Sequence, residues 1–100
     1  TYGPTGPVLV STDLIDDPAD LDIVCRVNGE TRQSSNTTHL IFDVPTLVEY
    51  ISSAITLAPG DMIFTGTPEG VGAMQGMFLA PGDVVETEIA GLGVLRNTCV

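Results

Sequence analysis

The residues best suited to chemistry lie in the loop from Gly66 to Gly72, whose sequence is GTPEGVG. Three glycines and one proline in seven residues disfavour helix and strand and predict an irregular loop with turns. A hydrophobic strand that leads into such a loop can present backbone N–H groups and the Thr67 hydroxyl to a small anion. The alternative is an ordinary wide loop whose glycines only satisfy left-handed turns, and spacing alone favours this alternative.

Two phosphate-binding motifs do not fit this loop. A P-loop ends in Gly-Lys-Ser/Thr, and the chain has no lysine. A dinucleotide-binding loop opens a helix, and no helical pattern follows Gly72. The anion, if one binds, is therefore held by amides and a hydroxyl.

A second candidate is the pair Glu86 and Glu88. Alternate positions of a strand place both carboxylates on one face, as a divalent metal site needs. No third ligand is apparent nearby, and such pairs on an amphipathic strand are usually solvated. We therefore expect a solvated pair rather than a metal site at these two residues.

The remaining polar groups make no complete active site. His39 is the only histidine, and we expect a residue at the surface or before the helix rather than a general base. The serines have no base in a recognisable motif. The run from Ser34 to Thr38 is either a plain surface loop or one that lines a site.

Length and composition limit the chain to one small domain. Of its 100 residues 43% are hydrophobic, which is a high share for so short a chain. We expect part of this apolar surface to be covered by a second subunit or by a missing part of the same domain. The first seven residues, TYGPTGP, suggest a cut or processed end.

The net charge of −10 comes from thirteen acidic residues and only three arginines. Nucleic-acid binding is excluded because such a chain cannot neutralise phosphates. An anionic substrate would need a divalent cation as mediator, although solubility is the plainer explanation of the charge.

Cysteine usage and hydropathy favour a cytoplasmic location. Cys25 and Cys99 are far apart, and Cys25 alternates within an apolar strand, which is typical of a buried thiol. The sequence shows no signal peptide and no apolar run long enough to span a membrane, so a membrane partner is not expected.

The sequence predicts strands with one helix in the middle. Asn28-Gly29 predicts a type I′ hairpin. Asp43 is the expected N-cap of a helix with Pro45 in its first turn, an end near Thr56 or Leu57, and one buried apolar stripe. The pentapeptide LAPGD occurs at 57–61 and 79–83 and indicates one turn used twice. Strands are expected at 8–11, 21–28, 30–33, 62–65, 84–90 and 94–100.

Several segments together resemble one family. The strings TYGPTGPVLV, VNGETRQSSNT, HLIF, LAPGDMIFTGTPEGVG and APGDVVETEIAGLGVLRN are similar to the C-terminal half of the fumarylacetoacetate hydrolase catalytic domain. Residues 1–100 would then be the C-terminal portion of a single domain. The implied fold is mixed β, a β-rich α+β roll or barrel portion with one central helix, and the implied assembly is a homodimer.

The resemblance also implies an activity. Family members use magnesium or manganese to chelate an α-keto acid and stabilise an enolate. They hydrolyse acylpyruvates, decarboxylate oxaloacetate-like acids, or isomerise and decarboxylate hydroxymuconate-type intermediates of aromatic breakdown. A non-catalytic dimerisation or assembly module that keeps only the fold segment is the alternative.

Site residues carry over at three positions. Thr67 matches the threonine that binds the substrate carboxylate, and Gly66 belongs to the same turn. Glu86 falls where the founding branch keeps a carboxylate that orients a catalytic histidine, whereas the shorter members that this chain resembles more closely place their acid/base pair on an N-terminal lid. The family's metal ligands, a Glu-x-Glu pair and an Asp, and the lysine of its KSFD-type motif would precede Thr1. The metal site would then have no ligand here, and the isolated segment should be inactive.

Overall fold

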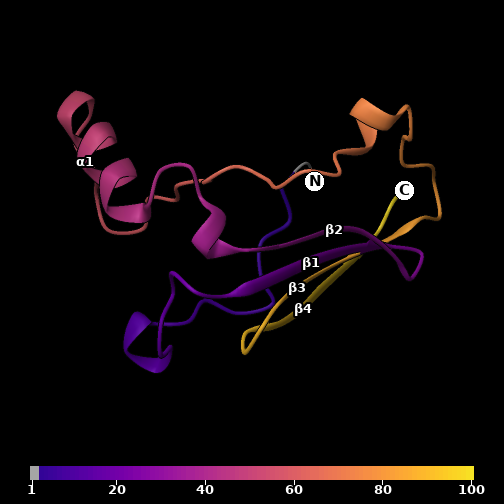
Figure 1. Cartoon of the computed structure of the whole chain (residues 1–100), viewed down its shortest axis with the longest axis horizontal. Coiled ribbons are helices and arrows are strands. Elements are labelled where there is room, and N and C mark those ends of the chain that lie inside the picture. Colours follow the sequence, from indigo (N-terminus) through magenta and orange to yellow (C-terminus); the bar gives the residue numbers. More distant parts are fainter. Residues whose placement is uncertain (1–2) are drawn as a thin grey trace.

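The computed structural model describes residues 3–100 and shows one antiparallel sheet with one helix beside it (Figure 1). Thr1 and Tyr2, the start of the expected N-terminal loop, lie outside the described residues. The sheet has the strand order β2-β1-β3-β4. The predicted fold class, β-rich α+β with one central helix, is confirmed. The elements are η1 (Thr12–Leu14), β1 (Asp22–Val27), β2 (Glu30–Asn36), η2 (Thr37–His39), α1 (Val44–Ala54), η3 (Gly72–Gln75), β3 (Val84–Ile89) and β4 (Gly93–Thr98).

The predicted β1–β2 hairpin is confirmed. Asn28 and Gly29 have φ values of 52° and 81°, the two positive angles of a type I′ turn. However, β2 continues to Asn36, so most of the polar run that we expected to be a loop is strand. Pairing with β1 explains this extension, because Ser34 and Ser35 lie opposite Val24 and Ile23 and the ladder uses backbone groups whatever the side chain.

Strand pairing gives the sheet two different faces. Cross-strand neighbours share a face, so Cys25 lies with Gln33 and Thr87, as predicted for the apolar side of β1. Arg26 lies on the other face with Glu86 and, through β3, with Arg96. The first face is apolar with a few polar groups, and the second is charged.

Two predicted strands are absent from the sheet. Residues 8–11 and 62–65 have no ladder partner among residues 3–100, and the second segment crosses from α1 towards η3 (Figure 1). Their apolar sequences suit strands, but a strand also requires a neighbour with free backbone groups. These two predictions were wrong for that reason.

Helix α1 begins where expected but its apolar stripe is not buried. Asp43 accepts a hydrogen bond from the Thr46 amide at 2.9 Å, and Pro45 lies in the first turn. The helix stands away from the sheet (Figure 1), and Val44 and Ile55 are 52% and 59% exposed. The predicted burial is therefore wrong within residues 3–100, since Leu47 and Ile51 are only half-buried and the rest of the stripe is exposed.

Apolar surface is left uncovered throughout. No side chain among residues 3–100 is buried, and Leu9, Ile41 and Met74 are about as exposed as in an extended chain, at 101%, 90% and 87%. The hydrophobic surplus of the sequence thus lies on the surface of this structure. The helices within residues 3–100 are too short or too polar for any of them to cross a membrane.

The two LAPGD segments form the same turn, as predicted. In each, the aspartate amide donates to the alanine carbonyl at 3.0 Å and the aspartate carboxylate accepts from the alanine amide. Within residues 3–100 only Asp83 has a further partner, since its Oδ1 accepts from Asn28 Nδ2 at 2.8 Å. The amide of Ala80, the Asn28 side chain and the charge of Arg32 hold the pKa of Asp83 below its usual value.

We expect Asp83→Ala to lower the melting temperature of the complete protein more than Asp61→Ala does. Both variants remove the turn contact, but only the first removes the tie to the hairpin. Because the folded-state pKa of Asp83 is depressed, its contribution is full above the ordinary aspartate pKa and disappears as the pH falls through the folded value. Thermal unfolding across this acidic range checks both points, and equal effects at neutral pH would contradict the extra role of Asp83.

Candidate functional site

The loop from Gly66 to Gly72 packs directly against β2. Gly70 has a φ of 98°, and a Cβ there would collide with the Arg32 carbonyl oxygen. Gly66 also has a positive φ, 101°, but a Cβ there would meet open space. The two glycines are therefore required for different reasons, Gly66 for backbone conformation alone and Gly70 for close approach as well.

Gln33 holds this loop in place, and it was missed as a site residue. Its Nε2 donates to Thr67 Oγ1 at 2.9 Å and to the Pro68 carbonyl at 2.8 Å, with the Glu69 carbonyl at 3.2 Å. The motif VNGETRQ supported only the resemblance. Strand alternation does not predict its position, because the Asn28-Gly29 turn alone would place Arg32 opposite Cys25. The register shift between Cys25 and Arg26 brings Gln33 to the Cys25 face instead.

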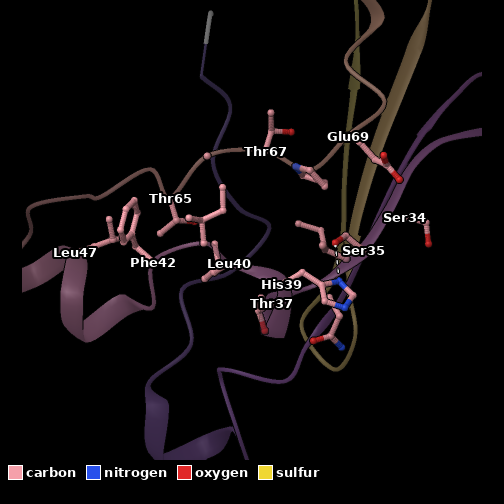
Figure 2. Close-up of a pocket in the computed structure, with 15 residues that line it drawn as sticks. Ser34, Ser35, Thr37, His39, Leu40, Phe42, Leu47, Thr65, Thr67 and Glu69 are labelled. Atoms are coloured by element: carbon pink, nitrogen blue, oxygen red, sulfur yellow. Dashed lines mark hydrogen bonds between the residues drawn. The ribbon is translucent and has the colours of Figure 1, made fainter.

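A cavity of about 710 Å³ lies beside the loop (Figure 2). Figure 2 shows Thr67 and Glu69 on one side and Ser35, Thr37 and His39 on the other. We call it the hydroxyl-rich cavity. Its lining residues are Ile23, Ser34, Ser35, Asn36, Thr37, His39, Leu40, Ile41, Phe42, Leu47, Thr65, Gly66, Thr67, Pro68 and Glu69.

Residues 34–37 of the polar run line this cavity, mostly from strand β2 and not from the expected loop, and their role in a functional site stays a prediction. Ser35 Oγ lies 3.3 Å from His39 Nδ1 (dashed in Figure 2). His39 is exposed, at the end of η2, as its expected surface position required. No third group that would make a catalytic triad accompanies this pair in the contacts of residues 3–100.

Two other polar residues of the lining serve the fold. Asn36 Nδ2 donates to the carboxylates of Asp20 and Asp22, at 2.9 and 2.8 Å. Thr37 Oγ1 accepts from the Leu21 amide at 2.8 Å. Because these contacts fasten the preceding loop to the end of β2, Asn36 and Thr37 are less available to a ligand than Thr67 is.

A second cavity of about 680 Å³ is lined by Gln33 itself. We call it the glycine-loop cavity, since Gly70 and Gly72 line it together with Cys25 and Arg32. The Arg32 guanidinium is paired with Glu30 at 2.8 Å. Thr67 lines both cavities, so its hydroxyl can be reached from either.

Glu86 is placed away from both cavities. It lies 3.3 Å from Arg96, and Glu88 lies 2.7 Å from Arg26, all on the charged face of the sheet. The two glutamates thus share a face as predicted, but each has an arginine partner. The catalytic role carried over to Glu86 stays a prediction. Within residues 3–100 no three metal-binding side chains gather in one place.

Comparison with known proteins supports one family. The family model described as fumarylacetoacetate (FAA) hydrolase, C-terminal, matches residues 1–100. Oxaloacetate tautomerase FAHD2A, a mitochondrial protein of Bos taurus, is 49% identical, and the match covers 100% of this chain and 32% of that protein.

Solved structures have the same fold. Fumarylacetoacetate hydrolase from Exiguobacterium antarcticum gives a TM-score of 0.89 at 44% identity, over 96% of this chain and 35% of that one. Maleylpyruvate hydrolase from Sphingobium sp. SYK-6, in complex with manganese(II) and pyruvate, gives 0.87 at 39% identity, over 95% and 34%. The chain therefore spans about a third of the length of the proteins it matches.

The contact between the loop and β2 can be tested with two matched variants. Gly66→Ala and Gly70→Ala both place an L residue at a positive φ, which costs roughly 1–3 kcal/mol. Only Gly70→Ala adds a collision with Arg32, for a further ~1–3 kcal/mol from overpacking. Denaturant unfolding of the complete protein should show this difference, and equal losses would mean that the loop does not touch β2.

Proposed function

We propose, from the premise that this chain belongs to the fumarylacetoacetate hydrolase family, that it supplies the substrate-carboxylate loop of a divalent-metal-dependent enzyme. The substrates would be α-keto acids or β-dicarbonyl compounds. The reaction would be acylpyruvate hydrolysis, oxaloacetate-type decarboxylation, or isomerisation and decarboxylation of hydroxymuconate-type compounds. The observation that carries this proposal is that Gln33 holds the loop by hydrogen bonds, with Thr67 in the lining of both cavities.

Two relatives support the substrate class. The Sphingobium structure holds pyruvate, an α-keto acid, and the bovine relative is named for oxaloacetate, another α-keto acid. The shared chemical group is a carboxylate next to a carbonyl. A hydroxyl donor and the backbone of a glycine-rich loop suit the carboxylate half of that group.

In this proposal Thr67 donates its hydroxyl proton to the substrate carboxylate. Gly66 allows the turn, since its φ of 101° is accessible to glycine without strain. The donor acts on a group that keeps its charge throughout the reaction, so it contributes mainly to binding and orientation. Glu86 remains a proposed orienting carboxylate for the complete enzyme.

The cation, magnesium or manganese, would be held by residues from outside this segment. Among residues 3–100 no cluster of three carboxylate, histidine or cysteine ligands exists, so these residues do not fit a metal centre. The acidic charge of −10 is nevertheless unfavourable to an anionic substrate without a cation.

Assembly and location are further parts of the proposal. The large exposed apolar surface favours a homodimer, packed with the remainder of the same domain. Cys25 and Cys99 are both free thiols, which suits a reducing cytoplasm. Nucleic acid and membrane are not expected partners.

The same exposed surface also supports a second candidate function. A non-catalytic dimerisation or assembly module would need apolar contact area and no reactive groups. The gene decides between the two candidates. A Glu-x-Glu pair and a KSFD-type lysine encoded before Thr1 support the enzyme, whereas their absence from the gene and from any partner chain supports the module.

We expect Thr67→Val in the complete protein to raise KM for keto acids about ten-fold or more with little change in kcat, since one hydrogen bond to a charged group is worth ~1.5–3 kcal/mol. Thr67→Ser keeps the hydroxyl and is the matched control. Steady-state kinetics with oxaloacetate, acetylpyruvate and fumarylpyruvate measure the effect. An unchanged KM for Thr67→Val would remove Thr67 from the site.

The proposal also makes a prediction about metal and segment. The complete protein should turn over at least one of these three acids with magnesium, and chelation should abolish the activity. Residues 1–100 alone should be inactive under the same conditions, because they lack the metal ligands. Metal-dependent turnover by residues 1–100 alone would contradict this division of the site.

A further inference from the structure

The side-chain amide of Gln33 makes three contacts with one turn of the loop. Its Nε2 lies 2.9 Å from Thr67 Oγ1, 2.8 Å from the Pro68 oxygen and 3.2 Å from the Glu69 oxygen. The side chain comes from β2, 34 residues earlier in the sequence than Thr67. It is therefore the main polar link between the sheet and the loop.

The two carbonyls determine which way this amide points. A backbone carbonyl can only accept, so the Pro68 and Glu69 oxygens require the NH₂ side of the Gln33 amide to face the loop. An amide nitrogen carries no lone pair for accepting a hydrogen bond. Thr67 Oγ1 must then accept from Gln33, and its own proton is directed elsewhere.

That proton has no acceptor within residues 3–100. The contacts of Thr67 Oγ1 in the structure consist of the bond it accepts from Gln33. Thr67 is exposed and belongs to the lining of both cavities, so a ligand bound in either cavity can supply the acceptor. Accepting one hydrogen bond also polarises the hydroxyl and makes it a better donor.

We propose that Gln33 is a positioning residue that, by donating to Thr67 Oγ1 and to the Pro68 carbonyl, commits the Thr67 hydroxyl proton to the substrate carboxylate. This inference rests on the proposed function. Gln33 acts through Thr67 and the turn, without touching the substrate. Gln33 makes Thr67 Oγ1 an acceptor towards the sheet and a donor towards the substrate. A threonine hydroxyl alone could take either role.

The main test is Gln33→Met in the complete protein, because methionine keeps the length of the side chain and removes the donor. We expect KM for the keto acid to rise about ten-fold, with kcat changed much less, since a carboxylate contact is lost equally in ground and transition states. Gln75→Met is the matched control, since Gln75 is the other glutamine, is exposed and lines neither cavity. The control should leave KM unchanged.

Coupling to Thr67 separates positioning from a general structural role. On a Thr67→Val background, Gln33→Met should raise KM little further, because the hydroxyl it orients is gone. Gln33→Glu should raise KM at neutral pH, where its carboxylate accepts the Thr67 proton. Lowering the pH towards about 4.3, the ordinary pKa of glutamate, should protonate the introduced carboxyl and restore a donor. The KM of Gln33→Glu should then fall towards that of the unmodified protein measured at the same pH.

A measurement independent of turnover covers the loop itself. Proteolytic cleavage of the folded protein within residues 66–72 should be about ten-fold faster in Gln33→Met and unchanged in Gln75→Met, because the loop detaches from β2 more often. Unchanged cleavage, an unchanged KM, or fully additive effects of Gln33→Met and Thr67→Val would overturn the positioning role. Absence of turnover by the unmodified protein would overturn the proposed function instead, so the two failures are distinguishable.

Discussion

The candidate site depends on the contact between the Gln33 side chain and the loop from Gly66 to Gly72. The loop has no ladder or helix to satisfy its backbone, so it needs partners from elsewhere. Gln33 supplies a donor to two consecutive carbonyls and to the Thr67 hydroxyl. Gly70 allows the approach, because any side chain there would collide with Arg32. Without this contact, no hydrogen bond within residues 3–100 would fix the position of Thr67 relative to the sheet.

The sheet determines on which of its two faces this contact forms. The two faces of β1 and β2 differ, and Gln33 lies on the face that carries Cys25, whereas Glu86 and Arg26 lie on the other. The two candidate motifs, the Gly66–Gly72 loop and the Glu86/Glu88 pair, thus lie on opposite faces of the sheet. The loop contributes to a cavity wall. The two glutamates form ion pairs between partly exposed side chains, which contribute little to stability.

The uncovered apolar surface is consistent with a segment that makes up about a third of its relatives. A four-stranded sheet with one detached helix leaves Leu9, Ile41 and Met74 in solvent. The segments 8–11 and 62–65 are extended and apolar yet unpaired. Each segment could pair with a further strand, which residues 3–100 do not supply. The same lack of packing partners explains why the α1 stripe is not buried.

Local chemistry by itself determined the hairpin at Asn28-Gly29, the start of α1 at Asp43 and both LAPGD turns. Each depends on the conformational preferences and short hydrogen bonds of a few adjacent residues. Motif similarity added Thr67 as a candidate site residue. Only the tertiary structure decided that Gln33 donates to Thr67, that residues 34–36 are strand, and that residues 62–65 lack a ladder. These features depend on partners many residues away, which a local pattern does not encode.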